Sequence, residues 1–199
     1  MRPILFSGPM VQALLDGRKT VTRRVVHPRV LATGDASCPY GAPGDWLWVK
    51  ETWAARDVRG DWAPKVRDVD QERDEIVYRT YLWGDPVAPP KRWFSPLHMP
   101  RWASRLTLEV VSVRVERLQE ITEEDARKEG LDWVSPQPFG ERWDDDREDP
   151  REVGYPDVGE VSGFARDNFR RLWDQINGER APWASDPWVW RVEVRRVPW

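Results

Sequence analysis

Apolar and polar residues alternate along several short stretches of the chain, which is the pattern of strands with one buried face. Residues 188–194 alternate strictly, so we predict a closing strand there, with Trp188, Trp190, Val192 and Val194 facing inward and Arg191, Glu193 and Arg195 facing outward. Residues 106–115 give the longest strand pattern, but the apolar phase switches midway, which indicates either two buried faces or a bulge. Further strands are predicted at 4–6, 20–26, 46–50 and 75–79.

Apolar residues that recur every three or four positions predict three helices. The first spans 9–16 and ends at Gly17, since only glycine enters the left-handed conformation cheaply. The second begins after Thr122 as N-cap and ends at Glu129, and the third spans 164–176. An acid at a helix C-terminus lies at the unfavourable end of the helix dipole, so Glu129 is singled out.

The strands do not alternate regularly with the helices, so a doubly wound sheet is not expected. We predict an α+β fold, a small mixed β-barrel flanked by short helices. The length of 199 residues fits one domain, spanning 1–199. Residues 54–75 are highly charged without periodicity, 84–100 are rich in proline, and 135–160 read as a long loop. We therefore expect two insertions, at about 54–100 and 135–185.

Composition limits the classes of partner. Charged residues make up 33% of the chain, but the net charge is only -3, so global charge does not indicate a nucleic-acid binder. Basic residues nevertheless gather at 18–29 and acids at 141–152, which allows a basic face. One cysteine excludes an internal disulfide, and we find neither a membrane-length apolar run nor a signal peptide. We expect a cytoplasmic monomer with no membrane partner.

The segment 17–24 concentrates four cations, two hydroxyls and a glycine between the first helix and a strand. Such a corner suits an anion or a polarised carbonyl, although a solvated basic turn is the alternative. Residues 98–105 combine aromatic, cationic and hydroxyl groups, which suits stacking on a base and binding a phosphate, or else packing under a tryptophan-rich core. The candidate substrate-binding residues are Arg24, Trp48, Glu51, His98, Arg101, Trp102 and Arg105.

Other chemistries find less support. His27, His98 and Cys38 lack the short spacing of a zinc site, so we expect no metal and no cofactor. Ser104 and His98 have no matching acid for a catalytic triad. A nuclease is compatible with the basic turn, but no paired carboxylates are placed for metal ions.

Several motifs, in this order, resemble the ASCH-domain family. The resemblance covers about half of the chain, and the longer form found in phages and prophages is the most similar. The motifs are Gly17-Arg18-Lys19-Thr20-Val21-Thr22-Arg23-Arg24, Cys38-Pro39-Tyr40-Gly41, Pro43-Gly44-Asp45, Trp48-Val49-Lys50-Glu51-Thr52-Trp53, His98-Met99-Pro100-Arg101-Trp102-Ala103-Ser104-Arg105, Leu118-Gln119-Glu120-Ile121-Thr122 and Glu129-Gly130.

The resemblance implies a PUA-like fold, a small β-barrel that binds RNA or nucleotides. Some compact members of the family are amidohydrolases that remove the acyl group from N4-acetylcytidine. The family's lysine and threonine match Lys19 and Thr22, its glutamate matches Glu129, and the arginine two residues past the threonine matches Arg24. This chain is about twice as long as the compact enzymes, so its insertions reshape or cover the pocket that the resemblance implies.

Amide hydrolysis needs a nucleophile, a base and a stabilised oxyanion. Lys19 would act as base with its pKa lowered by nearby cations, and Thr22 would supply the hydroxyl or orient a water. Glu129 would protonate the leaving amine or fix the lysine, and Arg24 would steady the oxyanion or a phosphate. Residues three apart on a regular strand face opposite sides, so this site requires a bend between Lys19 and Thr22.

Two functional classes follow. The first is a hydrolase acting on an N4-acylated cytosine nucleoside or nucleotide. The second is a PUA-like RNA- or nucleotide-binding module without catalysis, in which the basic turn holds phosphate and a tryptophan stacks on a base. Convergence of Lys19, Thr22 and Glu129 in one pocket would support the first class, whereas a Glu129 exposed to solvent far from Lys19 would leave only the second.

Overall fold

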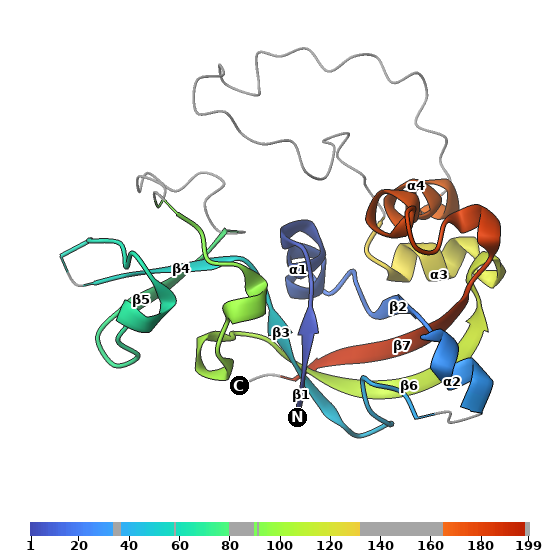
Figure 1. Cartoon of the computed structure of the whole chain (residues 1–199), viewed down its shortest axis with the longest axis horizontal. Helices are drawn as coiled ribbons and strands as arrows, with labels where there is room; N and C mark the ends of the chain where they lie inside the picture. The colour runs from blue at the N-terminus through green and yellow to red at the C-terminus, as the bar shows by residue number, and fades with distance from the viewer. Residues whose placement is uncertain (34–36, 58, 80–89, 91, 132–164, 198–199) are drawn as a thin grey trace, which may run out of the picture.

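A computed structural model describes residues 1–33, 37–57, 59–79, 90, 92–131 and 165–197. Figure 1 shows two long curving strands, with a pair of helices stacked at one end and a small separate sheet at the other. The predicted loop at 135–160 lies outside the described residues. Within the proline-rich segment 84–100, residues 84–89 and 91 also lie outside them.

The main sheet has five strands in the order β1-β3-β6-β7-β2. Its β1–β3 pair is parallel and the other pairs are antiparallel, so the sheet is mixed and the α+β prediction is confirmed. Within the described residues the sheet is open, with β1 and β2 at its edges, and no closed barrel is found. The strands are β1 (Arg2–Leu5), β2 (Val21–Val25), β3 (Trp46–Lys50), β6 (Thr107–Arg117) and β7 (Trp188–Val197).

The β6–β7 pair explains the phase switch seen in the sequence. Its register shifts between Val110 and Ser112, which is the predicted bulge. On β7, Trp190, Val192 and Val194 are buried as predicted, but Trp188 is 37% exposed, and the prediction that Arg191 faces outward is wrong. Arg191 is buried because helices cover the second face of β7 there and supply it with a carboxylate partner.

The three predicted helices are present, and a fourth, α2, was not predicted. Gly17 ends α1 with φ +74°, as expected for a residue in the left-handed region. The Thr122 hydroxyl accepts from the backbone N–H of Asp125, which confirms it as N-cap of α3. The helices are α1 (Gly8–Leu15), α2 (Pro28–Thr33), α3 (Glu123–Lys128) and α4 (Ala165–Asn177).

Three apolar clusters hold these elements together. The largest lies between α1 and the sheet and includes Val11, Leu47 and Val192. The second joins α3 and α4 to the sheet through Leu118 and Phe169. Short 3₁₀ turns connect the elements at Val66–Asp68, Pro96–His98, Arg101–Ala103, Leu118–Glu120 and Trp183–Ser185.

A second, two-stranded sheet consists of the strand predicted at 75–79 and a strand that was not predicted, within the charged segment that begins at residue 54. β4 (Trp53–Arg56) pairs antiparallel with β5 (Glu75–Tyr78). Trp53 is fully buried there against Phe94 and Met99, which form the third apolar cluster. The prediction of irregular structure is therefore wrong for β4, where three small or apolar residues were too few to give a strand pattern.

Candidate functional site

The basic turn runs along the end of α3. The backbone N–H of Lys19 donates to Ala13 O at 2.9 Å, and that of Thr20 donates to Lys128 O at 2.8 Å. Lys19 also forms an isolated antiparallel bridge with Glu129. β2 begins only at Val21, so Lys19 lies outside the regular strand and pairs with a different segment. Lys19 and Thr22 therefore do not lie on one regular strand.

The Lys19 side chain is buried and bonded in three directions. Its Nζ donates to Glu129 Oε2 at 2.6 Å, to Glu129 O at 3.0 Å and to Val21 O at 2.9 Å. These three acceptors account for all three hydrogens of an ammonium group. Lys19 is therefore held as a cation, with no lone pair directed toward Thr22.

Burial lowers the pKa of the Lys19 ammonium below its usual value of 10.5. The charge and hydrogen bond of Glu129 oppose this shift, and the positive charges of Arg24 and Arg23 add to it. The predicted direction is thus confirmed. The main physical cause is burial, however, and the neighbouring cations contribute less.

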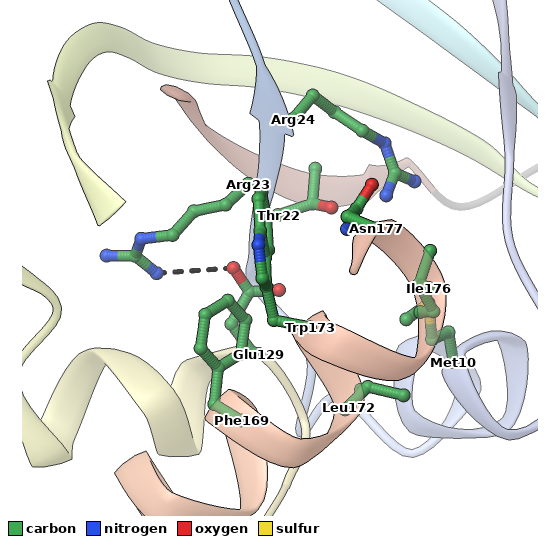
Figure 2. Close-up of a pocket in the computed structure, with 10 residues that line it drawn as sticks. All are labelled: Met10, Thr22, Arg23, Arg24, Glu129, Phe169, Leu172, Trp173, Ile176 and Asn177. Carbon is green, nitrogen blue, oxygen red and sulfur yellow. Dashed lines mark hydrogen bonds and ion pairs between the residues drawn. The ribbon is translucent and has the colours of Figure 1, made fainter. Parts of the chain in front are cut away.

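Arg23 connects Glu129 to two further carboxylates. Its guanidinium lies 3.2 Å from Glu129 Oε1, 2.8 Å from Asp125 Oδ2 and 2.7 Å from Glu116 Oε1, and its side chain is fully buried. A planar guanidinium with five N–H groups can serve several carboxylates at once. Figure 2 shows the bond from Arg23 to the Glu129 carboxylate.

Arg191 completes the cluster from β7. Its guanidinium donates to Asp125 Oδ1 at 3.0 Å and to Glu193 Oε2 at 3.3 Å. Burial raises the pKa of Asp125, but the hydrogen bonds and charges of Arg191 and Arg23 outweigh burial, so the net pKa is lowered. We define the buried charge network as three cations and three carboxylates: Lys19, Arg23, Arg191, Glu116, Asp125 and Glu129.

A small pocket borders this network. Its volume is about 30 Å³, and Thr22 and Glu129 both line it (Figure 2). Within the described residues the Thr22 hydroxyl makes no hydrogen bond, although Thr22 itself is buried. The residues lining the pocket are Met10, Thr22, Arg23, Arg24, Glu129, Phe169, Leu172, Trp173, Ile176 and Asn177.

Two pairs of the predicted catalytic residues therefore come together, but the three do not converge in one pocket, because Lys19 does not line it. Lys19 and Glu129 form an ion pair, and Glu129 shares the pocket with Thr22. Glu129 is buried at the end of α3, with 6% of its surface exposed. Arg24 also lines the pocket, while donating to Leu5 O at 2.8 Å and lying over the Phe6 ring at 5.1 Å.

The other six predicted binding residues do not line this pocket. Glu51 and Arg105 form a pair with two hydrogen bonds of 2.8 Å, and Arg105 lies 4.1 Å from the centre of the Tyr78 ring. Trp102 packs edge-on against Trp53 at 6.2 Å. The remaining three, Trp48, Arg101 and His98, are dispersed. The Trp48 ring lies under the Lys50 ammonium, Arg101 donates to Thr107 Oγ1, and His98 is exposed.

Sequence reasoning missed Arg23, Glu116, Asp125 and Arg191 as parts of the site. Each occupies a position that is equally compatible with solvent exposure: alternating strand positions or the first turn of a short helix. The only sequence signal was the presence of two adjacent arginines, Arg23 and Arg24, on a strand with β-branched neighbours. That signal does not say which arginine is buried.

Gly130 sets the distance between the turn and the helix end. It has φ +90°, and a Cβ placed on it would lie 2.7 Å from the Cβ of Ala13 and 3.1 Å from the Cβ of Lys19. Only glycine fits such a conformation at such close approach without displacing a neighbour. Gly130 therefore allows Lys19 to pack directly against the end of α3.

The described residues contain no group of three or more His, Cys, Asp or Glu side chains arranged to hold a metal ion. No described helix is long and apolar enough to cross a membrane. In comparisons with known proteins, no family model, curated protein or solved structure matches the chain.

Proposed function

We propose that the protein is a hydrolase that removes the acyl group from N4-acylated cytosine nucleosides or nucleotides. The observation that carries this proposal is the placement of Glu129, which is ion-paired to Lys19 at 2.6 Å and lines one pocket with Thr22. The resemblance of the motifs to the ASCH-domain family supplies the substrate class. The PUA-like barrel that the family implies stays a prediction, since it needs pairing beyond the open sheet described.

The geometry favours Glu129 over Lys19 as the base. All three hydrogens of the Lys19 ammonium are directed at carbonyl and carboxylate oxygens, and Lys19 does not line the pocket. Glu129 does line it, and a carboxylate accepts a proton without first losing one. Lys19 and Arg23 are thus positioning residues that fix the two oxygens of Glu129.

The reaction then runs as follows. The Thr22 hydroxyl holds a water, and Glu129 takes a proton from that water as its oxygen attacks the acyl carbonyl. A C–O bond forms and the carbonyl electrons move onto its oxygen, near the Arg24 guanidinium. The intermediate collapses, the C–N4 bond breaks, and Glu129 returns the proton to the amine. The products are the free carboxylic acid and the unmodified cytosine nucleoside.

A non-catalytic RNA- or nucleotide-binding module is the second candidate. It is favoured by Trp102, which is 39% exposed and adjacent in sequence to Arg101, a combination suited to stacking on a base and contacting a phosphate. This candidate predicts that affinity for single-stranded RNA falls linearly with salt on logarithmic axes, and that no small nucleoside is hydrolysed.

The test is an assay of N4-acetylcytidine hydrolysis, in which turnover is measured as the release of cytidine. We expect Glu129→Gln, Thr22→Val and Lys19→Met to lose about 10²- to 10⁴-fold in kcat/KM, the usual range for a general acid–base group. Glu124→Gln is the matched control, because Glu124 is an exposed acid on the same helix. An inactive wild-type protein, or three variants with unchanged rates, would contradict the proposal.

A further inference from the structure

The pocket has a buried end and an exposed end. Thr22, Glu129 and Trp173 are buried, whereas Ile176 is 53% exposed and Arg24 and Asn177 are half-buried. Figure 2 shows Arg24 and Asn177 close together on one side of Thr22, and the Glu129 carboxylate on the other. A substrate that enters past Arg24 and Asn177 therefore reaches the reactive groups with its leading end.

The volume limits what that leading end can be. One water needs about 10–15 Å³ of cavity, so about 30 Å³ holds roughly two groups of that size. A nucleobase ring has several times as many heavy atoms and does not fit. The methyl of an acetyl group does fit there beside the attacking water, because a methyl group is close to a water molecule in size.

The lining separates into an apolar wall and a polar floor. Leu172, Trp173 and Ile176 come from one face of α4, and Met10 adds to the wall from α1. Thr22 and Glu129 form the floor. A short acyl group matches this division, with its alkyl carbon against the wall and its carbonyl carbon facing the water at the floor.

We propose that the substrate enters acyl group first, and that the α4 wall restricts the enzyme to short acyl groups. This inference rests on the proposed hydrolase function. The cytosine and the sugar stay at the exposed end, where Asn177 supplies hydrogen-bond donors to them, and Arg24 lies between that end and the acyl group. Leu172 and Ile176 set the length of acyl chain that is accepted.

The test compares N4-acetyl-, N4-propionyl- and N4-butyrylcytidine with the wild type and with Leu172→Ala. A misfit of one methylene in an apolar pocket changes kcat/KM by about 10- to 200-fold. We expect the wild-type kcat/KM to fall at least about 10-fold from acetyl to butyryl. Leu172→Ala should raise the butyryl-to-acetyl ratio at least about 10-fold. Arg171→Ala, an exposed neighbour that does not line the pocket, should leave the ratio as in the wild type.

Ile176→Ala is a second variant in case Leu172→Ala does not fold, because Ile176 is half exposed and little core packing is lost. It should raise the same ratio. If the wild type hydrolyses none of the three nucleosides, the hydrolase function itself fails. If the wild type hydrolyses acetyl and butyryl substrates equally, or if both variants keep the wild-type ratio, the function stands and the acyl-first inference is overturned.

Discussion

Two ion pairs with buried carboxylates, Lys19–Glu129 beside α3 and Arg105–Glu51 beside the small sheet, were not distinguished by the sequence. In the second pair, the guanidinium and the carboxylate face each other with two parallel hydrogen bonds, and a tyrosine ring covers the guanidinium. In the first pair, each oxygen of Glu129 has a different cation, and the carboxylate borders a pocket.

This difference shows how a buried carboxylate becomes available for chemistry. A bidentate pair uses both carboxylate oxygens on one partner in a fixed plane, which favours a structural role. A carboxylate held by two cations on different elements is oriented without being covered, and it keeps lone pairs directed at the pocket. The buried charge network therefore resembles the support of a reactive group, whereas Arg105–Glu51 joins the end of β3 to the segment just before β6.

The largest expected effect is on stability at Arg23. Arg23→Met removes the cation shared by Glu116, Asp125 and Glu129, and leaves excess negative charge in a buried site. Breaking a buried ion pair from one side costs about 3–5 kcal/mol, so we expect at least that loss in the free energy of unfolding. Urea denaturation measures it.

Arg18→Met is the control for this experiment. Arg18 lies in the same turn, but its ion pair with Asp16 is more than one third exposed on both sides. Such a pair contributes about 1 kcal/mol or less. Equal losses for Arg23→Met and Arg18→Met would show that the buried charge network is not a stabilising unit.

A smaller effect is expected at Arg105. Arg105→Lys keeps the positive charge but loses the bidentate geometry, so one charged hydrogen bond to Glu51 is lost, at a cost of about 1.5–3 kcal/mol in stability. We expect kcat/KM for N4-acetylcytidine to stay within about 2-fold of the wild type, because Arg105 does not line the pocket. A 100-fold loss of activity with unchanged stability would place Arg105 in the site and remove the contrast between the two regions.

The smallest effect concerns pH and Asp125. Its pKa in the folded protein lies below the ordinary value of 3.8, so the unfolded chain takes up the proton first as the pH falls. The stability that Asp125 contributes is therefore present above about pH 4 and is lost as the pH falls through the folded-state pKa. Each unit of pKa shift corresponds to about 1.4 kcal/mol.

Unfolding in urea between pH 5 and pH 2 measures this contribution. Asp125→Asn should be less stable than the wild type at pH 5, and the difference should narrow toward pH 2. A constant difference across this range would mean that the carboxylate charge of Asp125 does not contribute to stability.

The sequence predicted the local parts of this architecture better than its long-range contacts. The α3 start at Thr122 and the left-handed Gly17 follow from local backbone rules, and both are confirmed. The bulge at Val110 was visible as a phase switch within one strand. In contrast, Arg191 occupies a polar position of the alternating pattern, which is typical of a solvent-facing residue. Its burial depends on α3, from a distant part of the chain, packing onto β7.

The candidate site shows the same division. Lys19, Thr22 and Glu129 were named from motifs, but the bonds of Lys19 to Glu129 span 110 positions in the sequence. Arg105 and Glu51 are residue types that commonly bind ligands, but in the structure they form an ion pair with each other. Residue type indicates what a side chain can bind, and only the fold determines which partner it has.

The close approach at Gly130 has a consequence for how this protein would respond to random mutagenesis. A side chain at position 130 would push against Lys19 and Ala13 together, and so would separate the ammonium from the Glu129 carboxylate. In a saturation screen for activity, this glycine would tolerate substitution as poorly as Glu129 itself. The map of intolerant positions would thus include a residue with no functional group, whose contribution is the space that it leaves empty.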